Sequence, residues 1–117
     1  MCAQKLSHDE NWPRANTLFT AGLNASDFAL IGIPAHKSSL SPTSANLTPG
    51  AIREALARYS TFAGSTKTDL TKLAMVDLGD VTDPDFADGE ARVAAAVENL
   101  LASHKLVMAL GGDNSIT

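Results

Sequence analysis

A short run of polar residues near the end of the sequence has the composition of a ligand-binding loop. The apolar residues 106–110 precede two glycines, and Asp113, Asn114 and Ser115 follow. An apolar run that breaks at two glycines predicts a buried strand that passes into a loop. Ligands bind at the carboxyl ends of the strands in open α/β sheets, so we expect this loop to line a binding site.

A second polar stretch follows the apolar residues 28–33. Residues 35–48 are largely polar, and unstructured loops of this length are usually functional or mobile. These side chains could contact an anionic or polar substrate, or they could simply face solvent. The candidates for such a contact are His36, Lys37, Ser38 and Ser39. For His36 the alternatives are a ligand or base and a hydrogen-bonded residue with no part in chemistry.

Two carboxylates, Asp77 and Asp80, lie near the end of another expected strand, residues 72–78. Their spacing would suit a metal ion or a general base. A strand that ends at a glycine-containing corner has the same residues, because Asp often caps such corners. The pattern supports both interpretations equally.

The elements that would position these side chains are three strands and two helices in alternation. The first expected strand is a continuous apolar run, as is typical of a strand covered on both faces. We expect strands at 28–33, 72–78 and 105–110, helices from residue 48 and over 90–103, and a polar connector at 63–71. This order predicts a βαβαβ unit over residues 28–117, with a parallel sheet between two helical layers, and a flap over residues 1–27.

The first helix has a recognisable start and an expected apolar face. Thr48 would cap it and Pro49 would occupy its first position. Ile52, Leu56 and Tyr59 follow at helical spacing and would face the core. Arg53 would then carry a solvated charge, or it would reach a carboxylate of a substrate.

The second helix and the flap would complete the core. The apolar stripe of the helix over 90–103 comprises Val93, Val97, Leu100 and Leu101. Trp12 is expected to pack over the core, because large aromatic residues usually serve packing.

Composition and charge exclude several classes of protein. The sequence is 44% hydrophobic and 19% charged, which is typical of a globular protein. The net charge of −4, with no block of Lys or Arg, argues against a nucleic-acid partner. One cysteine, Cys2, and three scattered histidines provide neither a disulfide framework nor zinc-ligand spacing. No apolar stretch is long enough to span a membrane and no signal peptide is visible, so we expect a cytoplasmic protein.

Three segments together resemble the ureohydrolases, the family of arginase, agmatinase and formimidoylglutamase. Residues 110–117 (Leu-Gly-Gly-Asp-Asn-Ser-Ile-Thr) are similar to the Gly-Gly-Asp-His-Ser signature of that family. Residues 31–34 followed by 48–53 resemble its first strand, long loop and first helix. Residues 76–81 (Val-Asp-Leu-Gly-Asp-Val) resemble its second strand and the corner after it. The resemblance covers roughly residues 12–117 and implies that the chain is the front part of an arginase-like, doubly wound domain.

The resemblance implies an enzyme with two Mn²⁺ ions that bridge a water molecule. The metal lowers the pKa of that water and directs it at a guanidinium or formimidoyl carbon. The histidine of the family signature binds one Mn²⁺. In the family the other ligands belong to Asp-x-His-x-Asp and Asp-x-Asp motifs further downstream, beyond the segment that the resemblance covers. We therefore expect this chain alone to be inactive and unable to hold both ions. In the family neither Asp77 nor Asp80 matches a metal ligand, which favours a structural role for both.

The sequence departs from the signature at one position, where Asn114 replaces the histidine. A neutral amide oxygen is a harder donor than an imidazole nitrogen and binds Mn²⁺ less well. Asn114 would bind the metal through its oxygen, or hydrogen-bond to a group that does. A third alternative is that the complete protein has lost a metal. Gly111, Gly112, Asp113 and Ser115 are expected to shape the loop and support the metal ligands.

The substrate class implied by the resemblance is a small amidine or guanidine. The start of the chain around Trp12 and the serine-rich loop are more similar to formimidoylglutamase-type members, so we expect hydrolysis of formimidoylglutamate to glutamate and formamide, with agmatinase or arginase activity as the alternatives. A non-catalytic ureohydrolase-like protein is the competing hypothesis. A nucleotide-binding module is disfavoured because no Gly-x-Gly-x-x-Gly follows the first strand.

Self-association is also expected. The third strand, over 105–110, would leave an apolar edge with no partner strand after it. We expect the isolated chain to associate through this edge and the complete protein to form a homo-oligomer.

Overall fold

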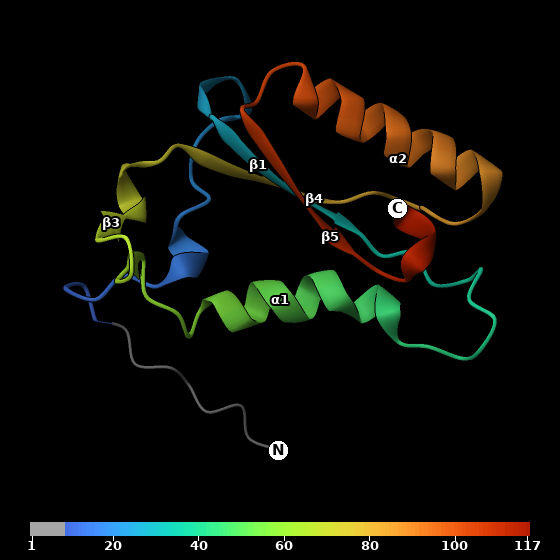
Figure 1. Cartoon of the computed structure of the whole chain (residues 1–117), viewed down its shortest axis with the longest axis horizontal. Helices are drawn as coiled ribbons and strands as arrows, with labels where there is room; N and C mark the ends of the chain where they lie inside the picture. The colour runs from blue at the N-terminus through green and yellow to red at the C-terminus, as the bar shows by residue number, and fades with distance from the viewer. Residues whose placement is uncertain (1–8) are drawn as a thin grey trace.

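The computed structural model describes residues 9–117, which form a three-stranded parallel sheet with one helix on each side (Figure 1). The sheet has the order β4–β1–β5, so β1 is central. Its strands are β1 (Phe28–Ile33), β4 (Met75–Asp80) and β5 (Leu106–Gly111), its helices are α1 (Thr48–Leu56) and α2 (Phe86–Leu101), and β2 (Phe62–Ala63) pairs with β3 (Thr68–Asp69) in a separate hairpin. The predicted α/β class with a parallel sheet is confirmed. Of the expected flap, residues 1–8 and with them Cys2 lie outside the described range.

The two crossovers explain why the helices lie on opposite faces. The chain runs from β1 through α1 to β4 on one side, then through α2 across β1 to β5 on the other. Crossovers of the same hand in opposite directions place their helices on opposite faces of a sheet. Figure 1 shows α1 and α2 on opposite sides of the strands.

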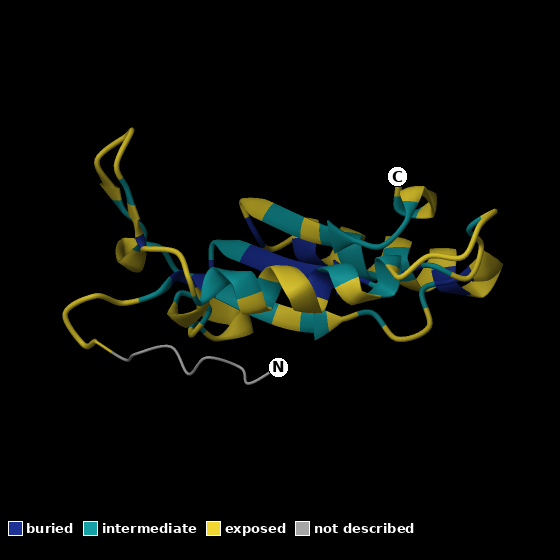
Figure 2. Ribbon diagram, turned by 90° about the horizontal axis from the view of Figure 1, so that it is seen from below, coloured by how far each residue is buried: buried dark blue, intermediate teal, exposed yellow. Residues whose placement is uncertain are grey.

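The strand β1 is the centre of the core, and its observed bounds equal the predicted ones. Five of its six residues are buried, and Figure 2 shows it as the dark blue centre of the molecule. A continuous apolar run suits this position, because both faces of a central parallel strand are covered. On the α2 face, Ala29 and Ile31 pack with Leu100.

The helix α1 turns a different face to the sheet from the predicted one. Its N-cap is Leu47, so Thr48 already lies inside the helix, and Pro49 is its buried residue. Ile52 is 37% exposed and Tyr59, which lies beyond the end of the helix at Leu56, is 65% exposed. Arg53 occupies the inward position instead, because carboxylates of β4 bind its guanidinium.

The remaining boundaries differ from the expected ones by a few residues. The second strand begins at Met75 because residues 70–72 form a 3₁₀ turn, and the third strand is shifted by one residue. The expected polar connector at 63–71 contains most of the β2–β3 hairpin, which begins at Phe62 and whose two-residue strands are too short to show an alternating pattern. Trp12 is 56% exposed and does not pack over the core as predicted.

The helix α2 begins at Phe86, one turn earlier than predicted, and ends at Leu101. Gly89 makes the early start sterically feasible, because a Cβ at this residue would lie 2.3 Å from the carbonyl carbon of Pro84. Leu100 is buried as expected, whereas Leu101 is 58% exposed and lies off the inward stripe. Within residues 9–117, no helix has the length and apolar character needed to cross a bilayer.

Candidate functional site

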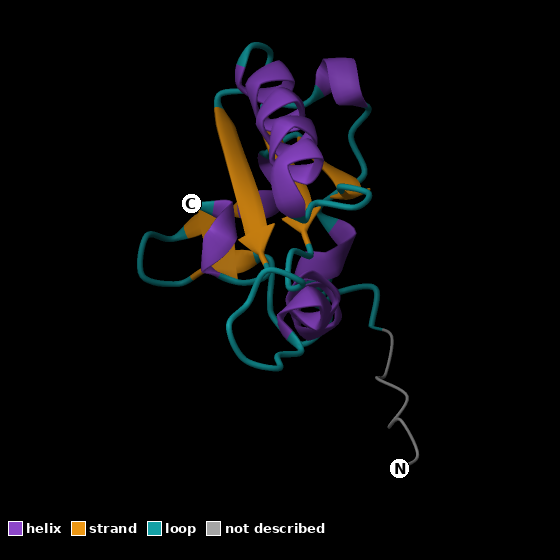
Figure 3. Ribbon diagram, turned by 90° about the vertical axis from the view of Figure 1, so that its right-hand side faces the viewer, coloured by secondary structure: helices purple, strands orange, loops and turns teal. Residues whose placement is uncertain are grey.

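The loops after β1 and β5 lie against each other at the carboxyl end of the sheet. Their backbones continue the pairing beyond the strands, since Gly112 N donates to Ile33 O and Asp113 N donates to Ala35 O, both at 2.9 Å. A Cβ on Gly112 would lie 2.1 Å from Ala35 O, so only glycine allows this approach. In Figure 1 these loops, the C-terminal turn and the start of α2 gather at the right-hand end of the sheet, and Figure 3 views the molecule from that end.

Asp113 organises the loop after β5 with both of its carboxylate oxygens. Oδ1 accepts hydrogen bonds from the backbone N–H of Ser115, at 3.1 Å, and from its hydroxyl, at 2.5 Å. Oδ2 accepts from the Ser39 hydroxyl at 2.6 Å, which ties the two loops together. These hydrogen bonds lower the pKa of Asp113. The largest effect comes from the Ser115 side chain and the next largest from Ser39.

Asn114 begins a short 3₁₀ turn, Asn114–Ile116, and its side chain is exposed. Among residues 9–117 no group donates to or accepts from its amide. Asn114 borders a cavity of about 330 Å³. The cavity is lined by Ser38, Ser39, Leu40, Ser41, Asp113, Asn114 and Ser115. The structure therefore brings the predicted serines and the predicted metal position to one cavity.

The described residues do not fit a dinuclear metal centre by themselves. Residues 9–117 contain no group of three or more His, Cys, Asp or Glu side chains that could bind one metal ion together. The Asp113 carboxylate is already engaged by serine donors. Asn114 offers one free amide oxygen, so a metal at this cavity would need further ligands from outside these residues.

His36 and Lys37 are held by a carboxylate that the sequence pattern did not single out. Asp85 Oδ1 accepts hydrogen bonds from the backbone N–H groups of His36, at 2.8 Å, and Lys37, at 2.7 Å. The His36 ring has Nδ1 at 3.2 Å from Pro34 O and at 3.8 Å from Asp85 Oδ2. A neutral ring with its hydrogen on Nδ1 donates to Pro34 O and leaves Nε2 with a free lone pair.

In the sequence, Asp85 is one of several aspartates just before or at the start of the second helix, where an aspartate often serves as a helix cap. It occupies the N-cap position of α2, but its side chain makes no hydrogen bond to that helix. No local pattern could have identified its partners, because they lie 48 and 49 residues earlier in the chain.

Asp77 and Asp80 bind Arg53 and are not available to a ligand in this structure. Arg53 Nε and Nη2 donate to the two oxygens of Asp77 at 2.7 and 2.9 Å, and Nη1 donates to Asp80. Burial raises the pKa of Asp77, but the Arg53 hydrogen bonds and the Gly79 N–H outweigh burial, and the pKa is lowered. This geometry supports the structural interpretation of both carboxylates and corrects that of Arg53, which is neither fully solvated nor free for a substrate.

A local irregularity of the sheet places both carboxylates beside Arg53. The register between β1 and β4 shifts after Leu30, so that Gly32 lies opposite Asp80. Gly79 provides the extra residue at a φ of +74°, a conformation that glycine adopts without strain. A Cβ on Gly32 would lie 1.9 Å from Asp80 Oδ1, so this contact also requires glycine.

The parallel sheet, the two covering helices and the loops at the carboxyl ends of the strands define a doubly wound α/β protein. The chain belongs to the arginase family, whose sequence profile matches residues 26–117. This match confirms the resemblance to ureohydrolases that the three sequence segments indicated.

Two similar relatives are formimidoylglutamases. The chain is 36% identical over 100 residues to the enzyme of Halalkalibacterium halodurans, covering 82% of this chain and 31% of the relative. It is 34% identical over 93 residues to that of Bacillus subtilis, covering 76% and 29%. The chain thus spans about a third of the length of the curated relatives it matches.

Solved structures agree with this fold. The formimidoylglutamase of Bacillus subtilis matches with a TM-score of 0.81 and 30% identity, over 99% of this chain and 38% of that one. The formiminoglutamase of Trypanosoma cruzi with Mn²⁺ matches with a TM-score of 0.79 and 25% identity, over 90% and 37%.

Proposed function

We propose that the complete protein containing this chain is a formimidoylglutamase. Water adds to the formimidoyl carbon of formimidoylglutamate, the bond from that carbon to the glutamate nitrogen breaks, and formamide and glutamate leave. The observation that carries this proposal is the 36% identity to a formimidoylglutamase over 82% of the chain. Agmatinase and arginase activity are the alternatives, because an agmatine ureohydrolase of Thermoplasma volcanium matches the fold with a TM-score of 0.80.

The proposed cofactor is Mn²⁺, two ions per site. The formiminoglutamase of Trypanosoma cruzi was solved with Mn²⁺, and so was its N114H variant. When bound, Mn²⁺ would supply Lewis-acid chemistry by lowering the pKa of a coordinated water. In this chain the free amide of Asn114 is the proposed contact to the metal, directly or through another ligand, and the remaining ligands would lie outside residues 9–117.

The residues around Asn114 would shape and support that contact. Gly112 allows the loop after β5 to approach Ala35, Gly111 lies against Ile116, and Asp113 and Ser115 close the turn around Asn114. The substrate would enter beside Ser38 and Ser39, which line the same cavity as Asn114.

The test is an assay of the complete, Mn²⁺-loaded protein with three substrates in parallel. We expect stoichiometric formamide and glutamate from formimidoylglutamate, and no urea from agmatine or arginine. Urea release from agmatine or arginine would favour the corresponding alternative. The 117-residue chain alone is expected to give no product with any of the three.

The competing function is that of a non-catalytic arginase-family protein. The observation that favours it is Asn114, which replaces a strong metal-binding side chain with a weaker one. Absence of both Mn²⁺ uptake and turnover in the complete protein would support this alternative. The proposal also includes a cytoplasmic homo-oligomer, which cell fractionation and sedimentation of the complete protein would test.

A further inference from the structure

Asp85 is a buried carboxylate whose hydrogen bonds serve a distant loop. It is 7% exposed, and its Oδ1 accepts from the backbone of both His36 and Lys37. An aspartate at an N-cap usually accepts from the first turn of its own helix, but this side chain makes no such bond. Charge-assisted hydrogen bonds to backbone N–H groups are stronger than neutral ones, so the loop after β1 is firmly held at this point.

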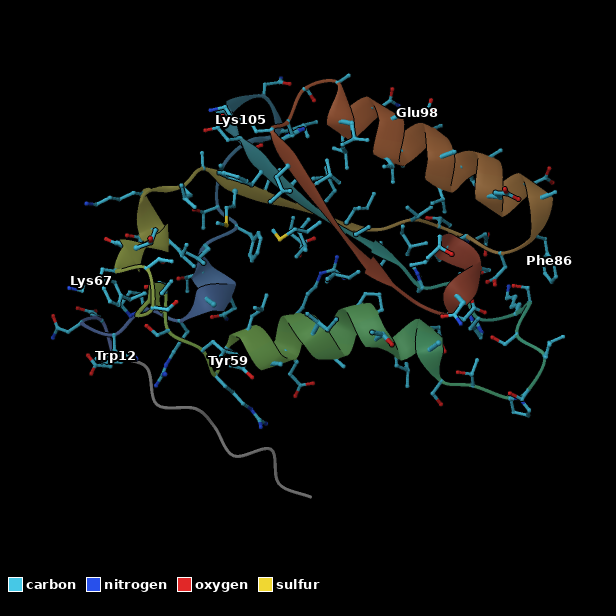
Figure 4. The ribbon with its side chains drawn as sticks, viewed as in Figure 1. Trp12, Tyr59, Lys67, Phe86, Glu98 and Lys105 are labelled. Carbon is cyan, nitrogen blue, oxygen red and sulfur yellow. The ribbon has the colours of Figure 1, made fainter. Side chains whose placement is uncertain are left out.

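The backbone around Asp85 is arranged so that its side chain leaves the helix. The next residue, Phe86, has a φ of +63°, which a bulky side chain rarely adopts. Figure 4 shows Phe86 at the outer corner where α2 begins, and this residue is 67% exposed. The absence of a Cβ on Gly89 leaves room for the backbone of Pro84 against the first turn of α2. The backbone is thus strained at Phe86, next to the point where the buried Asp85 carboxylate binds the loop after β1.

The loop held by Asp85 is the wall of the cavity beside Asn114. Two residues beyond Lys37, the hydroxyl of Ser39 donates to Asp113 Oδ2 at 2.6 Å. The loop is thus anchored at two points, at His36 and Lys37 by Asp85 and at Ser39 by Asp113. Residues 38–41, which include or adjoin the second anchor, line the cavity together with residues 113–115. One anchor comes from the start of α2 and the other from the loop after β5, so three parts of the chain determine where this wall lies.

We propose that Asp85 is a positioning residue for substrate binding, which it supports by holding the backbone of His36 and Lys37 so that residues 38–41 face Asn114. The role of this wall in binding an amidine substrate rests on the proposed function. Asp85 does not line the cavity beside Asn114, so in this proposal it acts through the loop and contacts neither the substrate nor the metal. Its loss therefore weakens substrate binding and leaves Mn²⁺ binding and the chemical step largely intact.

The experiment compares the complete protein with its Asp85→Ala and Asp85→Asn variants, all loaded with Mn²⁺. We expect Asp85→Ala to raise KM for formimidoylglutamate about tenfold, because two hydrogen bonds to a charged acceptor are lost, while kcat changes less than about threefold. Asp85→Asn keeps an oxygen at Oδ1 without the charge, so its KM should rise less. The Mn²⁺ dissociation constant should be the same in all three proteins.

A matched control is Asp69→Ala. Like Asp85, Asp69 is an N-cap aspartate whose side chain accepts a backbone hydrogen bond, here from Thr71 N in the 3₁₀ turn Leu70–Lys72, but it lies at the β2–β3 hairpin. Its KM should equal that of the unsubstituted protein. An unchanged KM in Asp85→Ala, or a loss of kcat without a rise in KM, would overturn the proposal, because the second result is what general destabilisation produces.

Amide hydrogen exchange gives a readout that does not depend on turnover. If Asp85→Ala fails to fold, Asp85→Asn should still exchange the His36 and Lys37 amides several-fold faster than the unsubstituted protein, and unchanged exchange would overturn the proposal. If the unsubstituted protein shows no turnover, the proposed function fails. The positioning role is then judged by exchange alone: faster exchange across residues 36–39 supports it, and unchanged exchange rejects it.

Discussion

Arg53 on α1 holds the carboxylate of Asp77 on β4 with two hydrogen bonds, of 2.7 and 2.9 Å. Both side chains are about three-quarters buried, so the pair is better shielded than a surface ion pair. Such two-point contacts between guanidinium and carboxylate are geometrically specific. This pair fixes the first helix to an outer strand of the described sheet.

Removal of Arg53 should therefore loosen the contact between α1 and β4. We expect Arg53→Ala to lower the free energy of unfolding by about 1–3 kcal/mol, since it leaves the largely buried Asp77 carboxylate without its partner. Arg53→Lys should recover only part of this loss, because lysine cannot make the two-point contact. Urea denaturation measures the difference. Equal midpoints for Arg53→Ala and the unsubstituted protein would show that the pair is not stabilising.

The same pair predicts how stability depends on pH. The pKa of Asp77 is lowered in the folded protein, so its contribution is present above the pKa of an unfolded aspartate, about 3.9, and is lost as the pH falls through the lower folded value. The stability difference between the unsubstituted protein and Asp77→Asn should shrink as the pH falls from about 6 to below 4.

The control for this pH dependence is Asp27→Asn. Asp27 pairs with Lys105 at 3.1 Å, but the Lys105 side chain is largely exposed and that of Asp27 is about half exposed. Exposed pairs contribute little, so this variant should show a small difference at every pH. A pH-independent difference for Asp77→Asn would mean that its charge does not stabilise the fold.

Gly112 should tolerate no side chain. A Cβ would collide with Ala35 O at 2.1 Å, so Gly112→Ala must separate the loops after β1 and β5. We expect a loss of about 2 kcal/mol or more in the free energy of unfolding and weaker Mn²⁺ binding by the complete protein. Gly50→Ala is the matched control, because a Cβ there meets no atom within 4 Å. Since alanine favours a helix over glycine, this control should stabilise α1 by up to about 1 kcal/mol.

Asn114 should influence metal affinity more than stability. Its amide has no partner among residues 9–117, so Asn114→Ala should leave the unfolding midpoint nearly unchanged. In the complete protein we expect it to weaken Mn²⁺ binding about 10- to 100-fold, and Asn114→His to strengthen binding. Isothermal titration with Mn²⁺ checks both, with Asn99→Ala on α2 as the control. Equal Mn²⁺ affinity in all four proteins would exclude Asn114 from the metal site.

The sequence by itself determined the features that depend on neighbouring residues. Strand β1 lies where its continuous apolar run predicts, because a central parallel strand needs such a run and little else. The alternation of strands and helices predicted the parallel sheet, and the three motifs predicted the family. The Gly-Gly pair after β5 predicted a loop at the carboxyl end of the sheet, where the cavity beside Asn114 lies.

Only the tertiary structure decided which polar side chains meet. Helical spacing alone assigned Ile52 and Tyr59 to the core. In the structure α1 turns Arg53 inward instead, because two carboxylates of β4 bind its guanidinium. These carboxylates lie more than 20 residues later in the chain. Asp85 looks like an ordinary helix cap in sequence, and its partners His36 and Lys37 become neighbours only when the sheet forms. A local pattern records the preferences of adjacent residues, whereas buried charges are satisfied by whichever partner the folded chain brings within reach.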